Sequence, residues 1–562
     1  MDNRKYNIYF NTHTISGIII CGVLYVMFFA GSFSFFKDDI AAWQENQSNR
    51  AADVQVNKDF NYLLDSLAKK HTLKGRDFDF TIQRNHTGAY VSMSASHDST
   101  VKATKAKAPS DGKRKRGRGR GRGGNDDSAF FGYDFAKQKE ADYASSYTMG
   151  EFLYRLHFLA QLNQVLPFRI GVPFGYMLAG IISFIFLFAL ITGLMLHWDK
   201  LVSNFFTFRP WSKWKNVWTE LHTVLGVIGF PYQLMFAITG VVLIFNSFLI
   251  VPYTKLFYNG DEEKIYKDLG YGLNSDYKYQ YKPLATSFNL NNLVSQTEKK
   301  WQKSDVSLVA IRNYGDYNMH VVIQGKPHTG AQMNGQGELV YRVRDSKILS
   351  ERSPLEPADY VSQMKGTLYH LHFGDYGGRP LKVMYFVLGI LGCIVINSGV
   401  LIWLVARDKK NTPAHKRKFN FWTANVYMSS SLSLLPVTTF TMIVLLFIKN
   451  AEQADIYHWF FYSWLALGIY FLAWRNLDAV NRQSTLLSAI LCLLLPVLDG
   501  IVRDNWFWQT YKRGALDILF IDALFLTLGI ISCVVYRKIT TGRHRQQKNI
   551  PAKSKAEPVR IA

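Results

Sequence analysis

Long apolar runs with few charged positions recur along the chain and predict membrane-spanning helices. A transmembrane helix needs about 20 mostly apolar residues, and eight windows meet this requirement. They cover residues 13–36, 174–198, 222–250, 381–405, 426–448, 457–474, 484–502 and 514–536. We therefore expect a polytopic membrane protein whose membrane part is all-α, with about eight transmembrane helices.

Two long polar segments, one after the first span and one after the third, carry weaker patterns of a different kind. In the first, KDFNYLLDSLAKK has helical apolar spacing, and FDFTIQR and AYVSMSAS alternate like two strands joined at the turn NHTG. In the second, LNNLVSQTEKKW is followed by VSLVAIRNY and YNMHVVIQG, which flank Gly315-Asp316. Each segment is thus predicted to form an α+β module, a helix followed by a hairpin.

Matched motifs make the first 405 residues two copies of one unit. Span one begins HTISG at His13 and span three begins HTVLG at His222. The offsets of 4, 18 and 23 residues from these histidines give Gly17, Gly31 and Phe36 in one copy and Gly226, Gly240 and Phe245 in the other. After each module comes LYRLHF or LYHLHF, with His157 and His372, and the next spans end in Thr192-Gly193 and Ser398-Gly399. The pattern predicts a duplicated helix–module–helix unit.

Positive charge fixes the expected topology. The net charge is +23, and basic residues cluster before span one, between spans two and three, and after spans four, six and eight. Short basic loops stay in the cytoplasm, so both termini are expected inside and residues 37–150 and 251–367 outside. A cleaved signal peptide ending near AGS at 30–32 is the alternative. It is disfavoured because the apolar run is long and its histidine belongs to the repeat.

One stretch fits this topology poorly. KRKRGRGRGRGG at 113–124, inside a biased segment spanning 103–127, is typical of disordered or nucleic-acid-binding tracts. The topology places it outside, where no nucleic acid is expected. We interpret it as a disordered insertion. Its basic residues would also suit binding to anionic lipid headgroups or to an acidic partner.

Four histidines mark the ends of the duplicated spans. A polar ring at the end of an apolar helix needs a partner, and a single such ring is usually satisfied by water or a carbonyl. Here symmetry would bring His13 against His222, the inner pair, and His157 against His372, the outer pair. Two opposed imidazoles suit the axial positions of a b-type haem, whereas zinc needs more ligands. The absence of a CxxCH motif from the sequence excludes covalent c-type haem. We expect two haems b, with iron held by these four histidines.

Further residues are candidates for supporting roles. His197 and His370 could replace a symmetric ligand, and His320 and His328 could line a substrate surface. Glycines such as Gly17, Gly226 and Gly389 would let a flat ring approach the backbone. Guanidinium groups match carboxylates in bidentate fashion, so three arginines are candidate propionate partners, with ordinary interface anchoring as the alternative: Arg155, Arg169 and Arg379.

The HTxxG span starts, the outer modules, LYxLHF and the TG or SG span ends resemble the PepSY-associated transmembrane helix family. That family includes PiuB-like iron-uptake proteins and inner-membrane ferric-siderophore reductases. The resemblance covers roughly residues 5–405 and implies PepSY-like modules in the periplasm of a bacterial inner-membrane protein. It also implies a di-haem oxidoreductase that reduces ferric siderophores or other ferric chelates during iron acquisition. The RG-rich insertion and the four C-terminal spans depart from the family pattern.

The implied partners are a ferric chelate, membrane lipid, and an electron donor that is either a quinol or a cytoplasmic reductase. No nucleotide-binding motif occurs in the cytoplasmic segments, so this chain does not oxidise NAD(P)H itself. Two other functions remain open: a siderophore or metal import permease, and a haem-free PepSY scaffold that binds peptides. Few charges lie in the middle of the spans, which disfavours the permease.

The expected domains follow from these patterns. They are 1–36 (first span), 37–150 (first module), 151–198 (outer linker and second span), 199–221 (cytoplasmic loop), 222–250 (third span), 251–367 (second module), 368–405 (fourth span), 406–425 (basic cytoplasmic linker), 426–536 (four-helix membrane bundle) and 537–562 (basic cytoplasmic tail).

Overall fold

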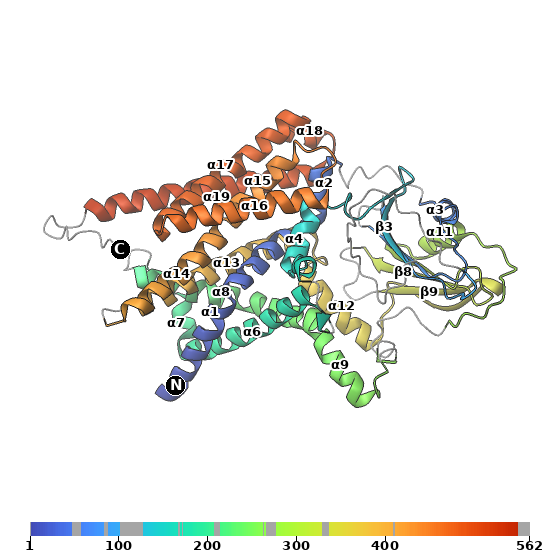
Figure 1. The fold of residues 1–562 in the computed structure, drawn as a ribbon, viewed down its shortest axis with the longest axis horizontal. Coiled ribbons are helices and arrows are strands. Elements are labelled where there is room, and N and C mark those ends of the chain that lie inside the picture. The colour runs from blue at the N-terminus through green and yellow to red at the C-terminus, as the bar shows by residue number, and fades with distance from the viewer. Residues whose placement is uncertain are drawn as a thin grey trace. The chain divides into compact units, whose positions relative to one another are not determined.

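A computed structural model shows the fold (Figure 1). It describes residues 2–47, 58–83, 88–101, 128–166, 169–170, 172–206, 209, 214–261, 264–265, 277–328, 336–408 and 411–548. The RG-rich insertion predicted within 103–127 and most of the NHTG turn lie outside the described residues.

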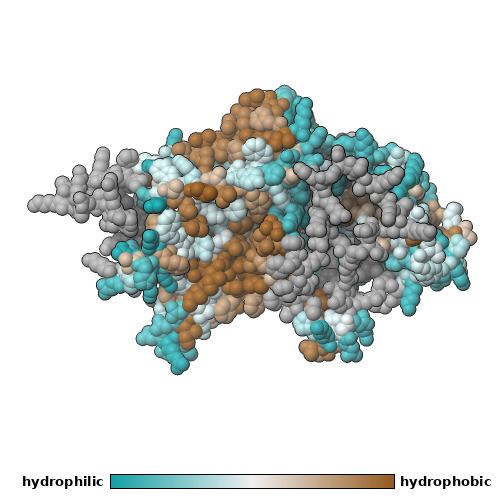
Figure 2. All heavy atoms as spheres, in the orientation of Figure 1, coloured by the Kyte–Doolittle hydropathy of each residue, from teal (hydrophilic) through white to brown (hydrophobic). Residues whose placement is uncertain are grey.

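Among the described residues, eight helices are long and apolar enough to cross a membrane. They are Asn3–Ser34, Phe174–His197, Asn216–Ile244, Gly378–Arg407, Ala414–Leu445, Gln453–Ala473, Leu477–Arg503 and Leu516–Thr541. Each overlaps one predicted window, so all eight predicted spans are confirmed as helices. Apolar side chains cover much of their visible surface (Figure 2). The chain is therefore mostly helical, with the composition of a multi-pass membrane protein.

The chain divides into two compact units. The first comprises Met1–Asp38, Ala52–Arg209 and Glu220–Val395, and the second comprises Asp39–Ala51, Pro210–Thr219 and Ile396–Ala562. All four histidines of the inner and outer pairs belong to the first unit.

Eight strands of the first unit form one antiparallel sheet in the order β10-β9-β8-β7-β1-β2-β3-β4. Their bounds are β1 (Phe78–Ile82), β2 (Gly88–Met93), β3 (Ala129–Asp134), β4 (Lys139–Ala141), β7 (Ser304–Arg312), β8 (His320–Pro327), β9 (Gly337–Arg342) and β10 (Lys347–Arg352). The two predicted hairpins, β1–β2 and β7–β8, are confirmed. The other four strands were not predicted, and β1 pairs directly with β7, so the two segments share one sheet.

Two helices, α3 (Phe60–Ala68) and α11 (Leu290–Lys300), cover one face of this sheet (Figure 1). Their starts are bonded reciprocally: Asn291 Oδ1 accepts from the Phe60 N–H at 2.7 Å, and Asn61 Oδ1 accepts from the Leu290 N–H at 3.1 Å. Apolar side chains from both segments form a single core beneath these helices, including Phe60, Leu64, Phe80, Val294, Val309 and Ile323. The two segments thus fold as one α+β body.

Long and short helices make up the rest of the first unit. Helix α1 (Asn3–Ser34) packs against α6 (Phe174–His197) and against the short α4 (Met149–His157). The remaining elements are α5 (Leu162–Val165), β5 (Arg169–Ile170), β6 (Val172–Pro173), η1 (Trp198–Lys200), α7 (Leu201–Phe205), α8 (Trp214–Gly240), the π-helical η2 (Val241–Phe245), α9 (Asn246–Phe257), η3 (Val343–Asp345), α12 (Tyr360–Phe373) and α13 (Gly378–Arg407). The first unit contains α8 only from Glu220 onward and α13 only as far as Val395. The helices α4 and α12 carry the two LYxLHF motifs.

The second unit is a helical bundle. Its helices are α2 (Lys37–Glu45, shared with the first unit), α14 (Ala414–Leu432), α15 (Leu434–Leu445), α16 (Gln453–Ala473), α17 (Leu477–Arg503), α18 (Phe507–Lys512) and α19 (Leu516–Lys548). Polar contacts join α2 to the bundle: the Trp43 indole Nε1 donates to Asp522 Oδ1 at 2.9 Å, and Arg503 Nη1 donates to the Trp43 carbonyl at 2.7 Å.

Candidate functional site

The inner pair lies between two long helices. His13 of α1 and His222 of α8 have ring centroids 6.2 Å apart, with ring planes inclined at 69°. Each ring donates from Nδ1 to a backbone carbonyl of a third or fourth helix at 2.9 Å, His13 to Ala189 of α6 and His222 to Val395 of α13. Four helices therefore contribute to fixing this pair.

The outer pair uses the two short helices. His157 ends α4 and His372 lies in the last turn of α12, and their ring centroids are 5.9 Å apart. His157 Nδ1 donates to the Met27 carbonyl of α1 at 2.7 Å. His372 Nδ1 lies 2.8 Å from Thr239 Oγ1 of α8. Each short helix thus brings its histidine into contact with a long helix, His157 with α1 and His372 with α8.

Since Nδ1 of every ring is bonded to the protein, Nε2 is the nitrogen through which each ring would bind a metal. Histidines that bind metals commonly donate their other ring N–H to a carbonyl or similar acceptor, which fixes the tautomer and orients the ring. Metal–nitrogen bonds of about 2.0 Å on each side would hold two opposed imidazole centroids about 6 Å apart. The observed separations of 6.2 and 5.9 Å fit two imidazoles that share one central atom.

Glycines set how closely the rings approach the helices. A Cβ at Gly31 would lie 2.5 Å from His157 Nδ1, and one at Gly193 would lie 2.9 Å from His13 Cε1. The side chain before Gly193 also bears on the inner pair, because Thr192 Oγ1 donates at 3.0 Å to the Ala189 carbonyl that accepts from His13. The TG motif that closes the second span therefore provides room for a histidine and contacts its acceptor.

The other glycines singled out by sequence differ from one another. A Cβ at Gly17 or Gly226, each one turn beyond an inner histidine, would meet no atom of the described residues within 4 Å. This open backbone on both helices fits the edge of a flat macrocycle. Gly389 instead faces Ser32, so it permits close packing of α13 on α1.

The two pairs occupy different levels along the same helices. On α1, His13 and the Met27 acceptor of His157 are 14 residues apart, which is about 21 Å at 1.5 Å per residue. This spacing is smaller than the roughly 30 Å hydrocarbon thickness of a bilayer.

The remaining candidate histidines have varied surroundings. His197 is the last residue of α6, the helix whose Ala189 carbonyl accepts from His13. His370 Nδ1 bonds Asp375 Oδ1 at 2.5 Å. In the α+β body, His320 is 3% exposed and stacks on Tyr277, so it lies in the interior and not on a substrate surface. His328 is exposed and bonds Asp305.

The candidate arginines have varied surroundings. Arg155 Nε donates to Glu151 Oε1 at 2.6 Å, and its guanidinium lies over the Tyr143 ring. Arg379 is half-buried near the start of α13. The side chain of Arg169 lies outside the described part of the chain.

A buried acid that the sequence reasoning missed lies on α4, the helix that carries His157. Glu151 of α4 forms ion pairs with Lys37 and Arg155 and accepts from Tyr143 Oη at 2.8 Å. Burial alone would raise the pKa of Glu151, but the charges of Lys37 and Arg155 outweigh burial and hold this pKa below its ordinary value. The available signal was Thr148-x-x-Glu151, which matches the capping-box pattern of a helix start.

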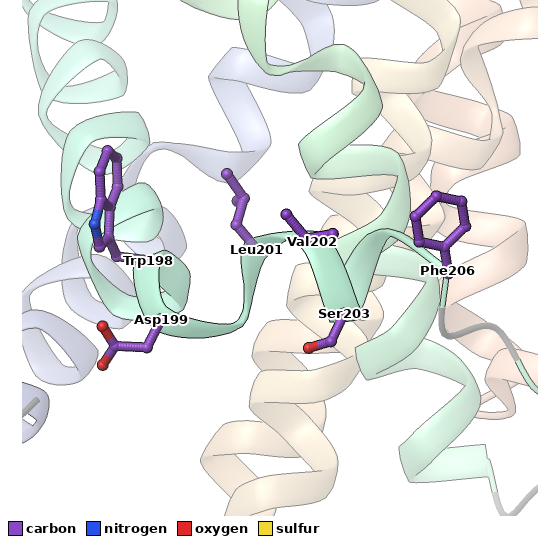
Figure 3. A pocket seen from close by; sticks show the side chains of 6 residues that line it. All are labelled: Trp198, Asp199, Leu201, Val202, Ser203 and Phe206. Carbon is purple, nitrogen blue, oxygen red and sulfur yellow. The ribbon is translucent and has the colours of Figure 1, made fainter.

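A hollow of about 520 Å³ lies beside the stretch that follows α6 (Figure 3). Its lining residues are Trp198, Asp199, Leu201, Val202, Ser203 and Phe206. All come from one short segment, and none of the four paired histidines reaches it. Among the described residues, no group of three or more His, Cys, Asp or Glu side chains is placed to hold a metal ion.

The fold and the paired histidines define a multi-pass membrane protein with an α+β body and two imidazole pairs inside its helices. The model of the PepSY-associated TM region matches residues 10–406, and the chain belongs to that family. The chain is also similar to the uncharacterized protein PA4219 of Pseudomonas aeruginosa, with 21% identity over 250 residues. The match covers 42% of this chain and spans about three fifths, 61%, of that relative's length.

Proposed function

We propose that the protein is a di-haem b oxidoreductase that passes electrons across the bacterial inner membrane and reduces ferric siderophores or other ferric chelates in the periplasm. The observation that carries this proposal is the pair of opposed imidazole sites, with centroids 6.2 and 5.9 Å apart and every Nδ1 bonded to the protein. Membership of the PepSY-associated family supports it.

The chain's own residues would hold and orient the cofactor. His13 and His222 would bind one haem and His157 and His372 the other, each through Nε2 because Nδ1 donates elsewhere. When bound, haem b supplies a one-electron carrier at each level of the membrane. The acceptors of the Nδ1 protons keep the imidazoles neutral and oriented, as a metal ligand requires.

The chemistry of iron explains the outcome of such a transfer. Hard oxygen donors of a siderophore favour Fe(III) and bind Fe(II) far more weakly. One electron converts one Fe(III) to Fe(II) and breaks no bond within the chelator, so the metal is released. A membrane quinol would supply two electrons, release two protons and serve two ferric ions, and a cytoplasmic reductase is the other class of donor.

We further infer that the α+β segments are PepSY-like modules of a duplicated unit and that both face the periplasm, with both termini in the cytoplasm. The reciprocal bonds of Asn61 and Asn291 and the basic short loops support this arrangement.

The test is the optical spectrum and the haem content of the purified full-length protein. We expect two haems per chain and a b-type reduced-minus-oxidised spectrum. The double variant His13→Ala with His222→Ala should retain about half of the haem, and so should His157→Ala with His372→Ala. His328→Ala is the matched control, because His328 is exposed outside both pairs, and it should retain both haems.

Ferric-chelate turnover with a ferrous trap then separates a reductase from a general electron carrier. A well-folded but colourless wild-type protein would overturn the proposal and favour the import permease or the peptide-binding scaffold.

A further inference from the structure

The acceptors of the four Nδ1 protons are not equivalent. Three rings donate to backbone carbonyls, those of Ala189, Val395 and Met27, whereas His372 meets the hydroxyl of Thr239 at 2.8 Å. Thr239 is 1% exposed, so no solvent competes for this contact.

Comparison of equivalent positions on α1 and α8 explains the difference. Met27 lies 14 residues after His13 on α1, and Phe236 lies 14 residues after His222 on α8. On α1, His157 bonds the Met27 carbonyl directly. In α8, Thr239 stands where α1 has Ala30, and its Oγ1 itself contacts the Met235 and Phe236 carbonyls at 2.7 and 3.3 Å. The hydroxyl therefore takes the place beside the carbonyls that a ring takes in α1.

The two equivalent glycines show that the His372 ring is displaced from the helix it contacts. A Cβ at Gly31 would lie 2.5 Å from the His157 ring, whereas one at Gly240, the equivalent position, would lie 4.0 Å from the His372 ring. The His372 ring thus lies farther from α8 than the His157 ring lies from α1.

Proton positions along this contact are fixed by chemistry. If Nε2 of His372 binds iron, Nδ1 carries the proton and donates it to Thr239 Oγ1. Thr239 then donates its own proton to the Met235 carbonyl, which can only accept.

An amide carbonyl is a stronger acceptor than a hydroxyl. A stronger bond from Nδ1–H makes the imidazole more electron-rich and raises its basicity as a ligand, which stabilises oxidised iron and lowers the reduction potential. The inner pair has two carbonyl acceptors, and the outer pair has one carbonyl and one hydroxyl.

We propose that Thr239 is a positioning residue that raises the reduction potential of the outer site above that of the inner site, and so directs electrons from His13–His222 toward His157–His372. This inference rests on the proposed function. In the step itself, the inner site is oxidised by one electron and the outer site is reduced by one, and no bond is formed or broken.

Three substitutions of Thr239 in the full-length protein test the proposal by redox titration of the spectrum. The outer signal is identified as the one lost when His157 and His372 are both replaced. Thr239→Val fills the hydroxyl's place without an acceptor, so the outer potential should rise. Thr239→Ala restores the residue of α1 and lets the ring approach the carbonyl, so the outer potential should fall. Each shift should be roughly tenfold in the reduction equilibrium, about 59 mV for one electron.

Thr239→Ser should leave the outer potential close to wild type because it keeps the hydroxyl. Thr254→Val is the matched control, since Thr254 is buried and the one contact described for its hydroxyl is to the Ile250 carbonyl of its own helix. Neither potential should move in that control.

The outcomes separate the two proposals. If two haems are bound but the outer potential is at or below the inner one, the proposed role of Thr239 is overturned and the proposed function is not. Equal outer potentials in Thr239→Val and Thr239→Ala would have the same meaning. Protein without haem would overturn the proposed function and this inference with it.

Discussion

Two glycines determine how near the histidine rings come to the helix backbone. Gly31 is in contact with His157 and Gly193 with His13, at distances that leave no room for a methyl group. Contacts shorter than 3 Å to a new Cβ force a shift of the ring or the helix. Because each ring also bonds a carbonyl on that same helix, the shift would break an orienting hydrogen bond.

Gly31→Ala is therefore expected to displace His157 and to cost the protein the haem that we propose for the outer pair. Haem per chain should fall from two toward one, measured from the absorbance of the purified protein. Gly468→Ala is the matched helical control, since a Cβ there meets no atom within 4 Å in the described part of the chain, and it should keep both haems. Full haem content in Gly31→Ala would show that the ring tolerates the added carbon.

At this scale the sequence identified the histidines but not their acceptors. The repeated HTxxG and LYxLHF motifs single out His13, His222, His157 and His372, and the structure has these rings in two close pairs. A backbone carbonyl such as that of Met27 carries no sequence signature, because every residue has one. The role of the four histidines as haem ligands stays a proposal.

Helix α4 shows how a short element can be held in place. Nine residues are too few for a stable isolated helix, and α4 depends on its cap at Thr148 and on Glu151 between Lys37 and Arg155. Its last residue is His157. The ion pairs of Glu151 with Lys37 and Arg155 therefore help to hold the helix that carries His157.

Glu151→Gln should lower the free energy of unfolding by about 2 kcal/mol at neutral pH, since one partner is lost from a largely buried group of charges. The folded-state pKa of Glu151 lies below its ordinary value of 4.5. Its stabilising effect is thus present above pH 4.5 and is lost as the pH falls through the lower folded-state value. Thermal unfolding at several pH values should show the variant and wild type converging in acid.

Glu298→Gln is the control for this substitution, because Glu298 pairs with Lys58 at a more exposed position of the same unit. Its effect should stay within about 0.5 kcal/mol. A constant difference between Glu151→Gln and wild type down to pH 3 would contradict the assigned charge state.

The helices and strands differ in how clearly the pattern of apolar residues in the sequence predicts them. All eight spans were predicted because twenty apolar residues leave little alternative. Strands β1, β2, β7 and β8 alternate clearly, but β4 has three residues, and β10 is almost wholly exposed and so lacks alternation. The β1–β7 pairing joins residues more than 200 positions apart, and local patterns contain no information about such a partner.

The two compact units of the chain are not consecutive segments of the sequence. The second unit contains Asp39–Ala51 as well as the C-terminal helices, and Trp43 is fully buried there with its indole donating to Asp522. A stretch near the N-terminus is thus part of the same core as residues almost 480 positions later.

Trp43→Phe keeps the aromatic ring beneath Arg503 but removes the donor to Asp522, which is 1% exposed. Leaving a buried carboxyl group without this bond should cost about 2 kcal/mol, seen as a lower melting temperature in detergent. The exposed Trp474 provides the matched Trp→Phe control and should change the melting temperature little. Equal melting temperatures for both variants would show that the Trp43–Asp522 bond adds nothing.

The shared sheet has a consequence for biosynthesis. When β1 and β2 have been made, one edge of β1 still lacks its neighbour, and β7 is synthesised only after another 200 residues or more. Unpaired strand edges invite association with other chains. A ribosome that stalls between these strands would release a chain with this edge exposed, so truncated products should be far more prone to aggregation than the finished protein.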